Sequence, residues 1–241
     1  GWTAYFPEGY KADKNRKGQL YHDAQEFESI FLDCAHQGYH IATHAQSPTA
    51  IGMVISSARA MRKENIKSVK GDFPIVRIEH CGLPQEKQSH ELSDLEIIAV
   101  NQPIHHHNWG DGVVTAVGNE IGERFNPLGE FVKNNVAFAL SSDAPVGKPN
   151  PFEAMAAAMD RLTVHGTELG ADDLKIDATT AFMAHTMGGA KALGKADLIG
   201  SIEVGKYADF AVVDTNPLTT DAGAMRQIGV LATYLGGQQS F

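Results

Sequence analysis

Short apolar runs alternate with amphipathic or polar segments over most of the chain. Each apolar run has the length of a buried strand and ends at a polar residue, and each is followed by a segment that has helical periodicity or a helix-opening proline. This alternation is typical of parallel β/α units, and it predicts the α/β class. The predicted strands are residues 39–43, 73–79, 96–101 and 136–140. The helices after them are 48–64, with Pro48 in its first turn, then 85–91, a segment before 134, and 151–164.

Other patterns mark the two ends of the chain. The first 20 residues mix aromatic, Gly, Pro and charged residues without a period, which predicts an arm. A helix is expected from Ala24, capped by Asp23 and ended by Gly38. We interpret residues 104–112 (IHHHNWGDG) as a long loop. After a helix near 179–193, apolar runs at 200–205, 208–214 and 230–235 predict antiparallel strands with no helix between them. A boundary near 195 would divide the chain into residues 1–195 and 196–241.

Charge and composition narrow the function classes. The 241 residues carry 20 Lys and Arg against 29 Asp and Glu, a net charge of −9 that argues against nucleic acid or an anionic membrane as the main partner. No apolar run reaches about 18 residues, so no membrane span is expected. Cys34 and Cys81 are too few for a disulfide scaffold, which favours a reducing compartment and a cytoplasmic location. The chain opens Gly-Trp-Thr, so either its start has been processed, with an upstream signal peptide left open, or it is part of a longer protein.

Candidate chemistry lies at the carboxyl ends of the predicted strands, where the βα loops of parallel folds converge. The residues at these ends are His44, His80, Gln102 and Asp143. Two imidazoles and a carboxylate form a ligand set that suits a divalent metal such as zinc. Alternation through the last strand puts the small residues 137, 139 and 141 on the face of Asp143 and the large residues 136, 138 and 140 on the other. We therefore expect Asp143 to point inward.

Simpler interpretations of these residues stay open. A single His at a strand end is commonly a hydrogen-bonded polar residue, and an Asp before Ala-Pro is commonly a turn or cap residue. Three consecutive histidines, His105 to His107, would point in different directions from an extended loop, so we assign one to the substrate and two to the loop surface. The chain has no GxSxG and no Gly-rich phosphate loop, which argues against a serine hydrolase or a nucleotide-binding enzyme.

Six motifs occur in an order that resembles the amidohydrolase superfamily of metal-dependent hydrolases, and within it the family 3 branch that includes N-substituted formamide deformylases. They are THA at 43–45, RIEH at 77–80, NQP at 101–103, SSDAPV at 141–146, NP at 150–151 and GSIEVGKYADFAVVD at 200–214. The resemblance runs from about residue 20 to the end. It implies a (β/α)8 TIM barrel with a small β-sandwich.

The resemblance also implies roles for the strand-end residues. His44 would be the metal ligand of the fifth barrel strand, His80 that of the sixth, and Asp143 the residue of the eighth that binds metal and takes a proton from the attacking water. His105 and Gln102 are expected to contact the substrate. The implied cofactor is one or two divalent ions, with Zn²⁺ as the expected metal, and the family suggests a homodimer.

Two family features have no counterpart in the sequence: the His-x-His pair of the first barrel strand and the Lys of the fourth. We therefore expect this chain to correspond to barrel strands five to eight and the last part of the sandwich. The other half would come from the same polypeptide or from a partner chain.

The expected activity is hydrolysis of an amide-like C–N bond in a small molecule, with a metal-activated water as nucleophile and Asp143 as general base. One alternative keeps the metal but deaminates a cyclic amidine or opens a cyclic imide. Another alternative is a non-catalytic paralogue or subunit. Metal content would distinguish the enzyme from the non-catalytic protein.

Overall fold

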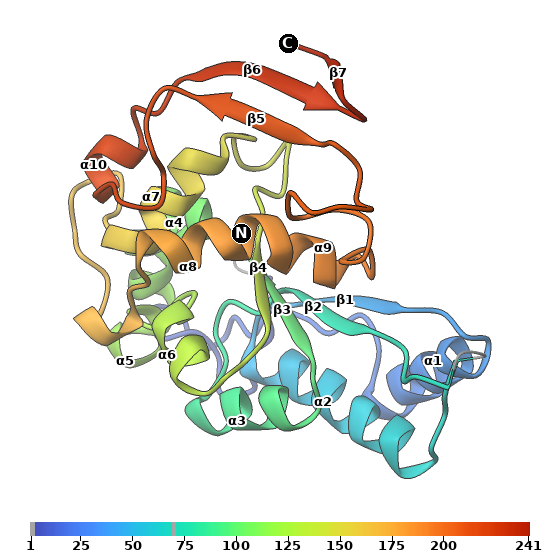
Figure 1. Cartoon of the computed structure of the whole chain (residues 1–241). Coiled ribbons are helices and arrows are strands. Elements are labelled where there is room, and N and C mark those ends of the chain that lie inside the picture. The colour runs from blue at the N-terminus through green and yellow to red at the C-terminus, as the bar shows by residue number, and fades with distance from the viewer. Residues whose placement is uncertain (1–2, 69–70) are drawn as a thin grey trace.

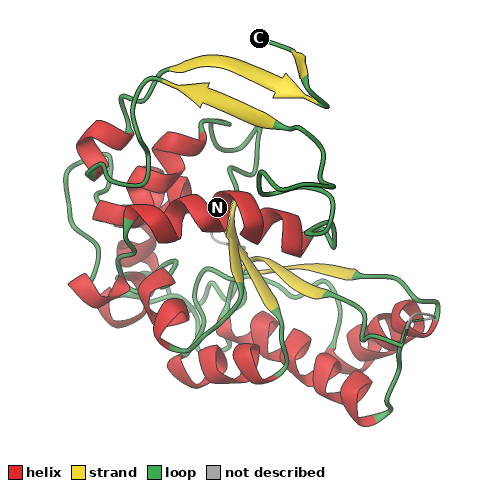
Figure 2. Cartoon of the chain, viewed as in Figure 1, coloured by secondary structure: helices red, strands yellow, loops and turns green. Residues whose placement is uncertain are grey.

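A computed structural model describes residues 3–68 and 71–241 as an α/β fold with two sheets (Figures 1 and 2). The strands are β1 (Ile41–Ala45), β2 (Val76–His80), β3 (Ile98–Asn101), β4 (Phe138–Leu140), β5 (Phe210–Val213), β6 (Val230–Leu235) and β7 (Gln238–Gln239). The helices are α1 (Ala24–His36), α2 (Pro48–Lys63), α3 (Glu86–Asp94), α4 (Pro103–Val117), α5 (Asn119–Gly122), α6 (Leu128–Lys133), α7 (Pro151–Asp160), η1 (Asp172–Leu174), α8 (Ala178–Met183), the π-helical turn η2 (Ala184–Gly188), α9 (Gly189–Ala192) and α10 (Ala222–Met225).

The four predicted strands of the first sheet are confirmed. They pair in parallel in the order β1-β2-β3-β4, so each strand lies beside its neighbour in the sequence. The register places Ala45 of β1 opposite His80 of β2, and Asn101 of β3 opposite Leu140 of β4. The carboxyl ends of the strands therefore form one edge, as the sequence predicts.

The main hydrophobic core lies between this sheet and the helices on its outer face. Figure 1 shows α1, α2 and α3 along one side of β1 to β3. Ile78 of β2 and Ala99 of β3 are fully buried there against residues such as Ile51 and Val54 of α2. Helix α1 begins as predicted, because the Asp23 side chain accepts hydrogen bonds from the first free backbone N–H groups.

The opposite face of the sheet carries smaller and more polar side chains. Ala139 of β4 packs there with Val100 of β3 and Ala192 of α9, whereas Leu140 packs in the main core. Residues 136 and 138 also pack with the main core, which confirms the predicted alternation of small inner and large outer residues. On β1 the inner face is exposed at His44.

The segment interpreted as a long loop is a helix, so that prediction was wrong. Helix α4 begins at Pro103 in its first turn and runs to Val117. His106 was expected on the loop surface, but it is fully buried and its Nε2 donates to the carbonyl of Ala157 in α7 (2.8 Å). Gly110 lets α4 lie close to the segment that follows α7, because a Cβ there would lie 2.2 Å from Leu169 Cδ1. Packing against α7 outweighs the poor intrinsic helix propensity of the segment.

His107, also expected on the loop surface, binds the main chain as well. Its Nδ1 donates to the carbonyl of Leu162 at 2.6 Å, just after α7. Two consecutive histidines thus join α4 to the α7 region. The loop assignment was wrong for both, and His107 is partly buried rather than exposed.

The second sheet is antiparallel, with the order β5-β6-β7. Two details of the prediction were wrong. Residues 200–205 form turns rather than a strand, and both Gly200 and Gly205 have φ of +96°. Helix α10 lies between β5 and β6, because Asp221 caps it and its Met225 is buried in the main core. The domain boundary near 195 stays a prediction.

The amino-terminal arm folds back on itself. The N–H of Phe6 donates to the carbonyl of Lys17 (2.8 Å), and the N–H of Gln19 donates to that of Thr3 (3.1 Å). Phe6 and Tyr10 then pack against Leu83, Ala116 and Phe125, which are close to the carboxyl edge of the parallel sheet. None of the described helices combines the length and the apolar character that a membrane crossing requires.

Candidate metal centre

His80, His105 and Asp143 lie together at the carboxyl edge of the parallel sheet. His80 ends β2, His105 is in the first turn of α4, and Asp143 follows β4. The ligand atoms that these three side chains offer all lie within 4.8 Å of one another. The Nε2 of His105 is 3.8 Å from the Oδ2 of Asp143, and the rings of His80 and His105 stack with centroids 5.8 Å apart. Three segments distant in the sequence thus converge on one point.

The backbone at the end of β2 departs from regular strand geometry. Val76 and Ile78 face the helix-covered core, and continued alternation would send the side chain of residue 80 to that same face. His80 instead has φ of +74° and Cys81 has φ of +45°. A left-handed conformation is uncommon for residues other than glycine and costs on the order of 1–3 kcal/mol. The turn ends the alternation at the residue that contributes its imidazole to the cluster.

Burial keeps both imidazoles of the cluster neutral. Burial, together with the neighbouring His80, lowers the pKa of His105 to about 4, whereas Asp143 acts in the opposite direction. Burial is also the main cause that lowers the pKa of His80, and His44 adds to it. Since only the neutral imidazole has a free nitrogen lone pair, both side chains are in the form that binds a metal ion.

The chemistry of the cluster fits a divalent metal. His80 Nδ1 and His105 Nε2 are buried, and neither has a hydrogen-bond partner among residues 3–68 and 71–241. A buried polar atom without a partner costs roughly 1–3 kcal/mol, so the pair is costly as it stands. Two nitrogen donors and one carboxylate oxygen are ligands that zinc accepts. A metal ion would satisfy both nitrogens beside the half-exposed carboxylate of Asp143.

The comparisons with known proteins agree with this geometry. The model of the Amidohydrolase family matches residues 1–241. The chain belongs to the amidohydrolase family. It is 28% identical to the N-substituted formamide deformylase of Arthrobacter pascens over 93% of this chain and 40% of that protein. It is 29% identical to a 5-methylthioadenosine/S-adenosylhomocysteine deaminase of Thermoanaerobacter pseudethanolicus over 59% of this chain and 30% of that protein.

Solved structures support the fold of this amidohydrolase chain. An uncharacterized metal-dependent hydrolase from Pyrococcus horikoshii OT3 superposes with a TM-score of 0.76 at 24% identity, over 92% of this chain and 43% of that one. The chain thus spans about 40% of the deformylase and 43% of this structure. The four parallel strands are part of the TIM-barrel architecture of this superfamily, as predicted.

The structure brings together some of the predicted site residues and not others. His80 and Asp143 meet as expected, and His105, expected to contact the substrate, lies in the group of possible ligands. His44 lies outside that group, but its ring is 4.4 Å from the ring of His80, so its role as a ligand stays a prediction. Gln102 is buried, and its Nε2 donates to Val100 and to Ser141. Its substrate contact also stays a prediction.

A cavity of about 890 Å³ opens beside the cluster. His44, His80, His105 and Asp143 line one part of it, and apolar side chains of the arm, α1 and α4 line much of the rest. Trp109, which the sequence reasoning missed, also lines it, and its ring lies 4.6 Å from that of His105. His105 and Trp109 are spaced i, i+4, so a helical interpretation of residues 104–112 would have predicted their contact.

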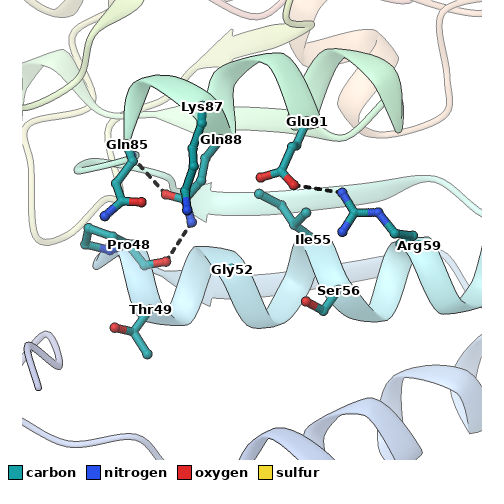
Figure 3. Close-up of a pocket in the computed structure, with 10 residues that line it drawn as sticks. All are labelled: Pro48, Thr49, Gly52, Ile55, Ser56, Arg59, Gln85, Lys87, Gln88 and Glu91. Atoms are coloured by element: carbon teal, nitrogen blue, oxygen red, sulfur yellow. Dashed lines mark hydrogen bonds and ion pairs between the residues drawn. The ribbon is translucent and has the colours of Figure 1, made fainter.

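A second, smaller pocket of about 310 Å³ lies between α2 and α3 (Figure 3). Its polar groups are largely used within the protein. Gln88 accepts from the N–H of Gln85 (2.9 Å) and donates to the carbonyl of Pro48 (2.8 Å), and Arg59 pairs with Glu91 (2.8 Å). The polar side chains that line this pocket therefore join the two helices, and we assign them a structural role.

Proposed function

We propose that this amidohydrolase chain serves the metal-dependent hydrolysis of an amide-like C–N bond in a small molecule, with zinc as the metal. The observation that carries the proposal is the cluster of His80, His105 and Asp143, in which two buried imidazole nitrogens have no hydrogen-bond partner among the described residues. The adjacent cavity has room for a small substrate.

The residues at the site would have different roles in the reaction. His80, His105 and Asp143 would hold the ion, with His44 at hand as a further ligand. A bound divalent ion would lower the pKa of its water towards about 7 and would polarise the scissile carbonyl. Asp143 reaches the cavity, so its carboxylate can accept the proton of the attacking water and return it to the leaving amine. Gln102 is a candidate substrate contact, and His105 would contact the substrate if His44 takes its place as a ligand of the ion.

The complete protein requires more than these residues. Within the described part of the chain, the outer edges of β1 and β4 have no strand beside them. Unpaired edges of a buried parallel sheet are unfavourable. We propose that further strands pair with them and close the barrel, supplied by the same polypeptide or by a partner chain, and that the complete enzyme is a homodimer.

Similarity to a deformylase and to a deaminase leaves two substrate chemistries to compare. The favoured one is hydrolysis of an N-substituted formamide, since the similarity to the deformylase covers 93% of the chain. The second candidate is removal of an amino group from a purine nucleoside, favoured by similarity over 59% of the chain. Formate release and ammonia release distinguish the two reactions.

The test uses the polypeptide at its encoded length. We expect it to release formate from N-substituted formamides and to lose this activity after treatment with a chelator. Asp143→Asn keeps the size of the side chain but removes the proton acceptor, so turnover should fall by roughly 100- to 10,000-fold. Unchanged turnover in this variant would contradict the role of Asp143. Ammonia release from a purine nucleoside, with no formate released from formamides, would favour the second candidate.

A further inference from the structure

Two buried asparagines lie directly behind His80. Asn101, at the end of β3, is fully buried, and its Nδ2 donates both to the carbonyl of His80 (2.8 Å) and to the Oδ1 of Asn126 (2.9 Å). Asn126 is 1% exposed. The left-handed turn that carries the His80 imidazole is therefore held by the side-chain amide of Asn101, which Asn126 holds in turn.

Asn126 joins the ends of two strands. Its Nδ2 donates to the carbonyl of Gln102 after β3 (3.1 Å), and its backbone N–H donates to the carbonyl of Gly82 after β2 (2.8 Å). The next link runs from Gln102 Nε2 to Ser141 Oγ (2.8 Å), two residues before Asp143. One network of hydrogen bonds thus connects the loops that carry His80 and Asp143.

The position of Asn126 is itself fixed by a buried cation. Arg161 has no exposed surface, and its Nη1 donates to the carbonyl of Asn126 (2.7 Å). Asn126 also has φ of +55°, a conformation that Asn adopts more readily than most residues. The hydrogen bond from Arg161 and the left-handed backbone conformation therefore both fix Asn126 in its position behind the two loops.

We propose that Asn126 is a positioning residue of the metal centre: it holds the ends of β2 and β3 in the register that brings His80 and Asp143 to one ion. The proposal rests on the proposed function. Asn126 touches neither substrate nor metal. It acts on His80 through Asn101, whose amide donates to the His80 carbonyl, and it binds the carbonyl of Gln102 directly. Partners behind metal ligands commonly change metal affinity by about 10- to 100-fold when they are removed.

The test measures zinc affinity of the encoded-length polypeptide by competition with a chromophoric chelator, a measurement that needs no substrate. Asn126→Gly keeps the left-handed backbone and removes both side-chain hydrogen bonds. Asn126→Asp keeps the size and the acceptor for Asn101, but it replaces the donor to Gln102 with an oxygen. We expect zinc affinity to fall by about tenfold or more in Asn126→Gly, and to fall also in Asn126→Asp.

Gln88→Ala is the matched control. It likewise removes a buried amide with two hydrogen bonds, but between α2 and α3 and away from the cluster (Figure 3). It should lower the melting temperature and leave zinc affinity unchanged. Parental zinc affinity in a folded Asn126 variant would overturn the proposal, as would an equal loss in Gln88→Ala or a failure of both Asn126 variants to fold. A parent that binds no zinc would overturn the proposed function, and this proposal with it.

Discussion

Replacing Arg161 by Met tests how much the buried network contributes to stability. Arg161 follows α7, and burial lowers its pKa to about 10, so it still carries its charge at neutral pH. Its guanidinium donates four hydrogen bonds to backbone carbonyls and, within the described chain, forms no ion pair with a carboxylate. Met has a similar length and provides no donor.

The expected loss follows from the acceptors that remain. The carbonyls of Glu123, Phe125 and Leu169 accept from Arg161 at 2.9, 2.9 and 2.7 Å. Asn126 also accepts from another backbone N–H, so its carbonyl keeps one partner. Three unsatisfied carbonyls at roughly 1–3 kcal/mol each would cost about 3–9 kcal/mol. Removing a desolvated cation offsets part of this, so we expect a net loss of about 3–5 kcal/mol.

Urea unfolding of the encoded-length polypeptide, followed by fluorescence, measures this loss as a change in the free energy of unfolding. Arg59→Met is the matched control, because Arg59 pairs with Glu91 on the exposed side of α2 and α3. An exposed ion pair contributes only about 0–1 kcal/mol. A loss below about 1 kcal/mol in Arg161→Met, or one equal to that of Arg59→Met, would refute the reasoning.

Two further predictions concern single side chains. Burial lowers the pKa of His185 in the folded protein, so the unfolded state binds more protons below a pH of about 6.5, and the stability that is present above this pH should be lost as the pH falls. The free energy of unfolding, measured from pH 7 to 5, should therefore depend less on pH in His185→Gln than in the parent. An identical pH dependence in the two proteins would contradict this. Trp109→Ala removes an aromatic side chain from the cavity wall beside His105, so KM should rise by about two- to tenfold with little change in kcat. A fall in kcat at constant KM would contradict the role of Trp109 in substrate binding.

The elements that carry strong local patterns could be predicted from the sequence. The four strands are short apolar runs bounded by polar residues, and the alternation from 136 to 143 identified which face of β4 packs in the main core. His80 and Asp143 were predicted together because parallel strands share one carboxyl edge, which depends on topology and not on side-chain detail. Asp23 predicted the start of α1 because capping is local.

Features that depend on long-range packing could not be predicted in this way. Helix α4 contains poor helix formers and is stabilised by contacts with α7, including the hydrogen bond of His106 to Ala157. Its misassignment as a loop also hid the approach of His105 to Asp143 and the pairing of His105 with Trp109. Asn126 lies in a segment without a distinctive pattern, and Arg161 lies near the end of a predicted helix. Nothing local indicates that the Arg161 side chain binds the backbone of Asn126 behind His80.

Crystals of the encoded-length protein grown with zinc offer the most direct test of the central claim, that His80, His105 and Asp143 mark a metal centre. Anomalous diffraction at the zinc absorption edge locates the ion without reference to activity. We expect a peak bounded by His80 and Asp143, with His105 or His44 completing the ligand set. A fully ordered site without an anomalous peak, or zinc held only by other residues, would contradict it.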